Sequence, residues 1–128
     1  MKRLISGFLM GALSMAAPAC AQDDAAPTSG AVSAAGAVVR GLDKVNGRTA
    51  DAELQTGGST ELLGLLVTLS DCRYPADNPT GDAYAFLTIR EPDTGTVQFE
   101  GWMIASSPAL SALDHSRYDV WVLRCSIS

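Results

Sequence analysis

The sequence predicts a small all-β domain, an antiparallel sandwich or barrel with one short helical turn. Short apolar segments recur along residues 38–128, and many of their side chains alternate between apolar and polar, as in half-buried strands. Glycine, proline, asparagine and aspartate, which favour turns, separate these segments. No internal repeat is visible, so we expect one domain with a single core between short strands.

Two hairpins are the clearest elements along the chain. The segments AVVRGLD and RTADAEL flank Asn46-Gly47, two residues that tolerate the positive φ of a tight hairpin turn. The segments AYAFLTIRE and TVQFEGWMIA flank the sequence Pro-Asp-Thr-Gly at 92–95, which suits a type I turn followed by a glycine bulge. Each pair of segments is therefore predicted to form two antiparallel strands.

Similar signals predict the remaining elements. The stretch ELLGLLVTLSDCRY (61–74) predicts two strand pieces joined at Gly64, which marks a bulge or a bend. The proline- and aspartate-rich stretch 75–82 is a loop, and 106–113 contains the short helical turn. The stretch YDVWVLRCSI (118–127) is the final strand.

Alternation along two strands assigns their faces. The final strand has one face that we expect in the core, formed by Trp121, Leu123, Cys125 and Ile127. On the strand before the loop, the apolar residues at 65, 67 and 69 share one face, and Cys72 falls on the other. Either both faces are partly buried, or a bulge near Ser70-Asp71 reverses the register.

The first 21 residues have the composition of an export signal. Two basic residues precede the apolar run 4–15, and Ala-Cys-Ala at 19–21 has the small-residue pattern of a cleavage site. We expect cleavage after this site and export to the periplasm. The less favoured alternative is a lipoprotein signal with lipid on Cys20, but the expected leucine three residues earlier is missing. No later segment is long and apolar enough to span a membrane.

Residues 22–37 are small and polar, so we expect a flexible linker between the signal peptide (1–21) and a single β domain (38–128). Loss of the signal peptide leaves seven basic against fourteen acidic residues. This acidic balance argues against nucleic acid or anionic lipid as the main partner.

The cysteines favour one disulfide bond. Cys20 leaves with the signal peptide or carries lipid, and Cys72 and Cys125 then remain as an even pair in a small exported domain. Two buried free thiols are the alternative. No CxxC motif occurs, and one histidine beside two cysteines is a poor supply of metal ligands. We expect no metal and no cofactor.

The only histidine, His115, lies in the polar stretch DHSR ahead of the final strand. Nearby serines and aspartates are the residue types of a Ser-His-Asp site, but no G-x-S-x-G elbow occurs and sequence neighbours rarely face one another. We therefore expect a solvent-facing turn and no catalytic residue. Calcium at Asp77 and Asp82 is less favoured because the spacing matches no calcium loop. Glycan hydrolysis is less favoured because nothing selects a pair of acids.

Three stretches, GLDKVNGRTADAEL, CRYPADNPTGDAYAFLTI and GWMIASSPALSALDHSRYDVWVLRC, resemble a family of small exported bacterial proteins. The family is known as domain of unknown function twenty-one fifty-five and is seen mainly in alphaproteobacteria. The resemblance runs from about Gly41 to Cys125, and residues 101–125 are its most specific part. It implies a protein class and no mechanism. Genes of this family often lie beside one that resembles an accessory factor of respiratory complex I.

Aromatic and apolar residues near the final strand indicate where such a protein would bind. The possible binding surface comprises Trp102, Met103, Pro108, His115 and Tyr118. We expect a non-catalytic envelope domain that docks on another protein, for example as an accessory subunit of an inner-membrane complex such as respiratory complex I. The alternative is a periplasmic glycan-binding module, in which an exposed Trp102 or Trp121 stacks on a sugar ring. A hydrolase is the least favoured class.

Overall fold

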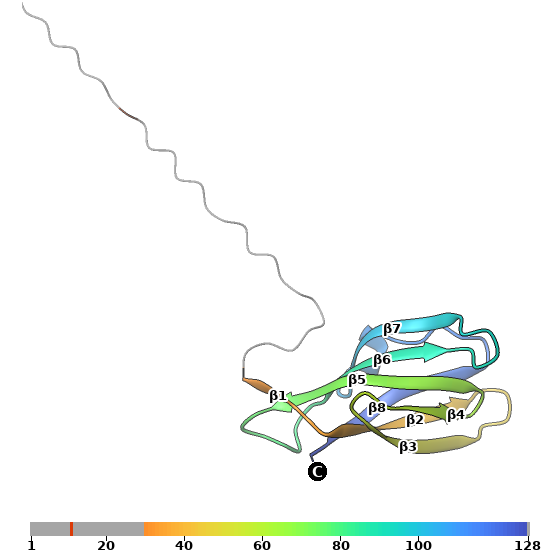
Figure 1. The fold of residues 1–128 in the computed structure, drawn as a ribbon, viewed down its shortest axis with the longest axis horizontal. Coiled ribbons are helices and arrows are strands. Elements are labelled where there is room, and N and C mark those ends of the chain that lie inside the picture. The colour runs from red at the N-terminus through yellow and green to blue at the C-terminus, as the bar shows by residue number, and fades with distance from the viewer. Residues whose placement is uncertain (1–10, 12–29, 128) are drawn as a thin grey trace, which may run out of the picture.

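Two antiparallel β-sheets face each other as a sandwich (Figure 1). The computed structural model describes residue 11 and residues 30–127. Apart from residue 11, the expected signal peptide, with Cys20, and the first part of the expected linker therefore lie outside the described residues. In the part of the chain that is described, no helix has the length and apolar character needed to cross a membrane.

Eight strands and one 3₁₀ turn make up the described fold. The strands are β1 (Ala31–Ser33), β2 (Gly36–Asp43), β3 (Thr49–Gln55), β4 (Ser59–Leu62), β5 (Leu65–Pro75), β6 (Tyr84–Arg90), β7 (Val97–Ile104) and β8 (Tyr118–Ser126), and the 3₁₀ turn is η1 (Pro108–Leu110).

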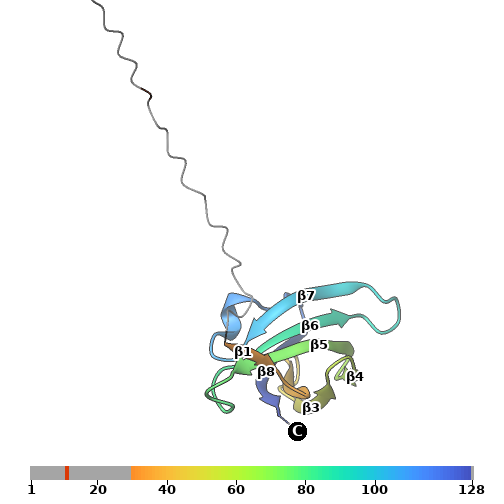
Figure 2. The same cartoon turned by 60° about the vertical axis from the view of Figure 1, so that its left-hand side comes forward.

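The larger sheet has five strands and the smaller one has three. In the larger sheet, β1, β5, β6 and β7 follow one another, and β4 pairs with the same edge of β5 as β1 does. The smaller sheet has the order β3-β2-β8. Figure 2 shows β7 at the outer edge of the larger sheet. The predicted all-β, antiparallel fold is confirmed, and of the two predicted forms it is the sandwich.

Both predicted hairpins are confirmed. Between β2 and β3, Gly47 has a φ of 77° and its N–H donates to the carbonyl oxygen of Asp43 at 2.8 Å. Between β6 and β7, Gly95 has a φ of 73° and its N–H donates to the carbonyl oxygen of Glu91 at 2.8 Å. In both turns glycine occupies the position that needs the left-handed backbone.

Gly64 lies in the tight turn between β4 and β5, where Leu62 pairs with Leu65. Leu63 in this turn has a φ of 58°, which is unusual for a residue with a side chain. A Cβ atom at Gly64 would lie 2.5 Å from the hydroxyl oxygen of Tyr118. Glycine is therefore required here because the ring of Tyr118 packs directly on the turn.

The β domain begins earlier than the sequence predicts. β1 and the start of β2 lie inside the segment 22–37 that we expected to be a linker, and Ala34 and Ala37 are buried. The linker was predicted because such small side chains bury little apolar surface. At position 36 the lack of a side chain has a steric reason, because a Cβ atom at Gly36 would clash with the carbonyl oxygen of Leu54.

A bulge in β5 decides the orientation of Cys72. The pairing of β5 with β6 shifts between Leu69 and Asp71, so Ser70 is the extra residue. Leu69 and Cys72 are consequently both fully buried. Of the two alternatives left open by the sequence, the bulge is confirmed.

A second irregularity corrects the prediction for the final strand. Val39 pairs with Val122 but Val38 pairs with Arg124, so Leu123 is an extra residue in β8. Val120, Val122 and Cys125 therefore face the core. Strict alternation wrongly placed three residues in the core: Trp121 and Leu123 are half-buried, and Ile127 is 49% exposed.

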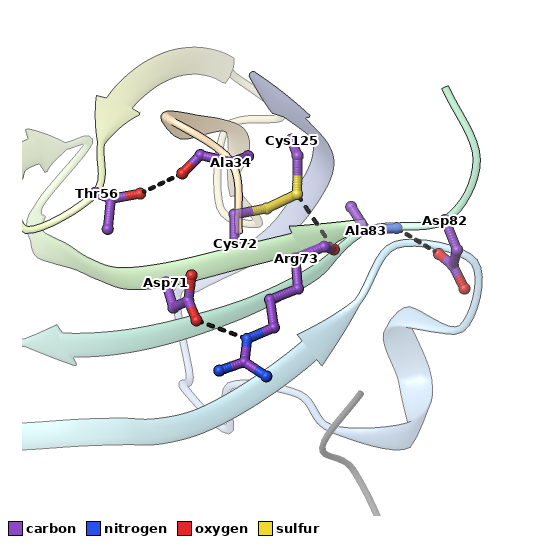
Figure 3. The surroundings of a disulfide bond; sticks show 8 residues. All are labelled: Ala34, Thr56, Asp71, Cys72, Arg73, Asp82, Ala83 and Cys125. Atoms are coloured by element: carbon purple, nitrogen blue, oxygen red, sulfur yellow. Dashed lines mark hydrogen bonds and ion pairs between the residues drawn. A yellow bond between two sulfur atoms is a disulfide. The ribbon is translucent and has the colours of Figure 1, made fainter. Parts of the chain in front are cut away.

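The predicted disulfide between Cys72 and Cys125 is confirmed, and it joins the two sheets (Figure 3). Its Cα atoms are 5.8 Å apart, an ordinary separation for a disulfide. Around it, the core consists of medium-sized side chains from both sheets. The largest fully buried residues are Val39, Leu65, Val67, Leu69, Leu87, Ile89, Met103, Val120 and Val122.

Candidate functional site

Of the five residues predicted to form one binding surface, His115 and Tyr118 lie together, with ring centres 5.2 Å apart, but the others do not join them in one patch. Trp102 and Met103 are neighbours on β7 and point to opposite faces of the sheet, so Met103 is only 1% exposed. Pro108 begins η1 and is exposed. Trp102 and Met103 therefore cannot contribute to one binding surface, because neighbouring residues of a strand cannot share a face.

His115 is held in a hydrogen-bond network, which corrects the expectation of a solvent-facing turn. Its side chain is 14% exposed. The Nδ1 atom accepts the backbone N–H of Arg117 at 3.0 Å and that of Tyr118 at 3.1 Å. These two bonds assign the ring proton to Nε2, which donates to Oε1 of Glu91 at 3.1 Å.

An ion pair between a buried carboxylate and a half-exposed guanidinium lies beside this histidine. Asp43 is at the end of β2 with a side chain only 6% exposed, and Nη2 of Arg117 donates to its Oδ2 at 2.9 Å. Hydrogen bonding to the Arg117 guanidinium holds the pKa of the Asp43 carboxyl below its ordinary value, and burial opposes this shift. The same guanidinium lies over the ring of Tyr118, 5.3 Å from its centre.

The network joins three connections of the fold at one end of the sandwich. Glu91 belongs to the β6–β7 turn, Asp43 and Lys44 lead into the β2–β3 turn, and residues 115–118 enter β8. Lys44 strengthens the junction because its Nζ donates to the carbonyl oxygen of His115 at 2.6 Å. These contacts give the DHSR stretch a positioning role.

The geometry gives no support to the hydrolase hypothesis at His115. Both ring nitrogens are already hydrogen-bonded, to backbone N–H groups and to Glu91, so neither is directed at a serine. The hydroxyl of Ser106, one of the candidate nucleophiles, donates instead to Oδ2 of Asp82 at 2.6 Å. A Ser-His-Asp site needs the serine oxygen on the imidazole.

The calcium hypothesis receives no support from Asp82 either. Its Oδ1 accepts the N–H groups of Ala83 and Ser106, both at 2.9 Å, and these bonds tie the loop before β6 to the segment after β7. Within residues 30–127, no cluster of three or more histidine, cysteine or acidic side chains has the arrangement of a metal site.

A surface groove lies between η1 and β8, and we call it the β8 groove. Its volume is about 430 Å³, and its lining is mainly apolar: Pro108, Ala109, Ala112, Leu113, Val120 and Trp121. Lys44 and Asp119 supply its polar groups. Leu110, in the same 3₁₀ turn as Pro108, is 76% exposed. The face assignment placed Trp121 in the core, and only the glycan-binding alternative exposed it, because the sequence does not locate the bulge at Leu123.

The other tryptophan, Trp102, belongs to a cluster on the outer face of the larger sheet. Its ring contacts Phe86 edge to face, with centres 5.4 Å apart, and the Arg73 guanidinium lies 5.7 Å from its centre. Arg73 is fixed by a 2.8 Å ion pair with Asp71. Because Arg73 already lies over the ring, this geometry does not favour stacking of a sugar on Trp102.

Comparison with known proteins identifies the family. A family model described as "Uncharacterized protein conserved in bacteria (DUF2155)" matches residues 37–125. The chain belongs to this family. The match extends from β2 to Cys125 of β8 and includes the whole disulfide loop and the β8 groove. The family predicted from the sequence is therefore confirmed.

A distant curated relative carries no functional name. The uncharacterized protein RP359 of Rickettsia prowazekii (strain Madrid E) is 28% identical over 87 residues, which are 66% of this chain and 56% of the relative. The aligned part of the DUF2155 chain thus spans little more than half the length of that protein. No solved structure gives a significant match.

Proposed function

We propose that this DUF2155 protein is a non-catalytic protein-interaction domain of the bacterial cell envelope, and that its partner binds in the β8 groove. The observation that carries the proposal is the outward position of Trp121, which lines an apolar groove next to the exposed Leu110. Apolar surface of this kind often marks a binding site, and tryptophan is enriched among the residues that dominate interface energy.

The proposed location is the periplasm. The N-terminal pattern of basic residues, apolar run and small residues supports export, and so does a disulfide between two otherwise buried cysteines. The partner we propose is another envelope protein. In the finer form of the proposal, the domain is an accessory subunit of an inner-membrane complex such as respiratory complex I.

Photo-crosslinking in living cells tests this proposal. A photoreactive amino acid in place of Leu110 should give one discrete crosslinked partner. Ile127, which is 49% exposed and lies outside the lining of the groove, is the matched control position and should not give that product. Trp121→Ala should remove the crosslink from position 110, because the groove loses its largest side chain.

Two results would contradict docking in the β8 groove: equal crosslinking from positions 110 and 127, or a crosslink at 110 that persists in Trp121→Ala. Native gel separation of the crosslinked envelope addresses the finer form. Migration of the product with an inner-membrane complex supports it, and migration as an isolated pair contradicts it.

A further inference from the structure

We propose that the free edge of β7 is a strand-addition site, where an extended, basic segment of a partner protein pairs with the larger sheet. β7 is the last strand of that sheet, and within residues 30–127 no other strand pairs with its second edge (Figure 2). This edge is a different surface from the β8 groove. The inference goes beyond the proposed function and does not require the groove to be the docking site.

The register of the sheet shows which backbone groups face this edge. Ala105 N donates to the carbonyl oxygen of Ala83 at 2.9 Å, in the same register as the ladder between β6 and β7. Hydrogen-bonded and non-hydrogen-bonded pairs alternate along an antiparallel ladder. The N–H and C=O groups of Glu100 and Trp102 therefore point away from β6. Outside the strand ladders, the described residues offer these two N–H groups no backbone acceptor.

The edge of β8 differs because side chains already bond part of it. β8 also ends its sheet, but two of its N–H groups donate to side chains instead of to β2. Tyr118 N donates to Nδ1 of His115 at 3.1 Å, and Val120 N donates to Oδ1 of Asp119 at 3.0 Å. Proteins protect edge strands from unwanted pairing in such ways. Two outward N–H groups of β8 are thus already bonded to side chains, whereas the outward N–H groups of Glu100 and Trp102 on β7 have no such acceptor among the described residues.

The chemistry of the open edge selects its occupant. Donors and acceptors at every second residue match an extended backbone, which is how peptides add to sheet edges. Glu100 is an exposed residue of β7 whose Oε2 accepts a hydrogen bond from Oγ1 of Thr88 on β6 at 3.1 Å. Its negative charge and the formal net charge of −5 of the chain favour a basic segment over a second copy of the same acidic chain. The half-buried Trp102 favours apolar side chains at alternate positions of the added strand.

A titration followed by nuclear magnetic resonance tests the site. The oxidised, isotope-labelled chain is titrated with a capped octapeptide of alternating lysine and valine, and with a glutamate–valine octapeptide as control. The lysine peptide should shift the amide signals of residues 98–104 and slow hydrogen exchange at Glu100 and Trp102. The amides of Tyr118 and Val120 should not respond. The glutamate peptide should bind more weakly.

Three variants separate the effects of the backbone N–H of residue 100, the charge of Glu100 and the side-chain bond at the β8 edge on peptide binding. Glu100→Pro removes an N–H that points off the edge and leaves the ladder with β6 intact, so the lysine peptide should bind about tenfold more weakly. Glu100→Gln removes only the charge and should weaken binding about two- to threefold at low salt. Asp119→Ala frees the Val120 N–H and should add a response at β8.

Several outcomes would overturn strand addition at β7. They are shifts confined to the β8 groove, unchanged affinity in folded Glu100→Pro, equal affinity for both peptides, or no response at millimolar peptide. Concentration-dependent broadening of β7 signals without peptide would assign the edge to a second copy instead. Each of these outcomes leaves docking in the β8 groove standing, so the two proposals fail separately.

Discussion

Replacement of His115 by alanine, asparagine or glutamine separates the contributions of its two ring nitrogens to the stability of the fold. Alanine removes the acceptor for two backbone N–H groups and the donor to Glu91. A hydrogen bond contributes about 0.5–1.5 kcal/mol net, and the Arg117 N–H belongs to an exposed residue that water can reach. We therefore expect His115→Ala to lower the free energy of unfolding by about 2–3 kcal/mol, whereas a solvent-facing residue would cost less than about 0.5 kcal/mol.

The other two substitutions each restore one end. Asparagine places its Oδ1 close to the position of the histidine Nδ1, so it should recover more than half of the loss. Glutamine places an amide nitrogen near the position of Nε2 and should recover only the bond to Glu91. Urea unfolding followed by tryptophan fluorescence should rank stability as wild type, asparagine, glutamine, alanine. An alanine variant within about 0.5 kcal/mol of wild type, or glutamine above asparagine, would refute the positioning role.

Four further variants test other parts of the same structure. Asp43→Asn should destabilise the protein at pH 7, and the difference from wild type should shrink in acid unfolding experiments. Pairing with Arg117 holds the folded-state pKa of Asp43 below its ordinary value of 3.8. The stability that this carboxylate contributes is therefore complete above pH 3.8 and is lost as the pH falls through the folded-state pKa. Replacement of Cys72 and Cys125 together by alanine should cost about 2–5 kcal/mol, measured by urea unfolding, and equal stability with and without reductant in wild type would contradict this. Trp121→Ala should cost less than about 2 kcal/mol in thermal melts while Leu87→Ala, in the core, costs about 2–5 kcal/mol; the reverse order would place Trp121 in the core.

Local turn chemistry was sufficient to predict much of the fold. Glycines at 47 and 95 each provide a backbone conformation that other residues avoid, and both hairpins formed where they indicate. The disulfide followed from counting cysteines in a chain with an export pattern. These features depend on residues close together in sequence or on simple pairing.

Two of the errors arose where a single residue or a distant partner decides the outcome. One extra residue at Leu123 reverses the faces of β8 before and after it, and alternation alone cannot locate such a bulge. His115 was misplaced because its partner Glu91 lies 24 residues away, on the turn of another hairpin. The groove beside Trp121 could not be predicted either. The bulge at Leu123 sets the face on which Trp121 lies, and the position of η1 sets the other wall of the groove.

The disulfide also determines how the protein responds to proteolysis. Cys72 and Cys125 are separated by 53 residues, and the loop they close contains β6, β7, η1 and most of β8. A protease that cuts once anywhere inside this loop leaves both products covalently linked, so neither Leu110 nor the edge of β7 can be released as a fragment. In an oxidising compartment, shedding of either proposed binding surface requires two cuts or one cut and a reductant.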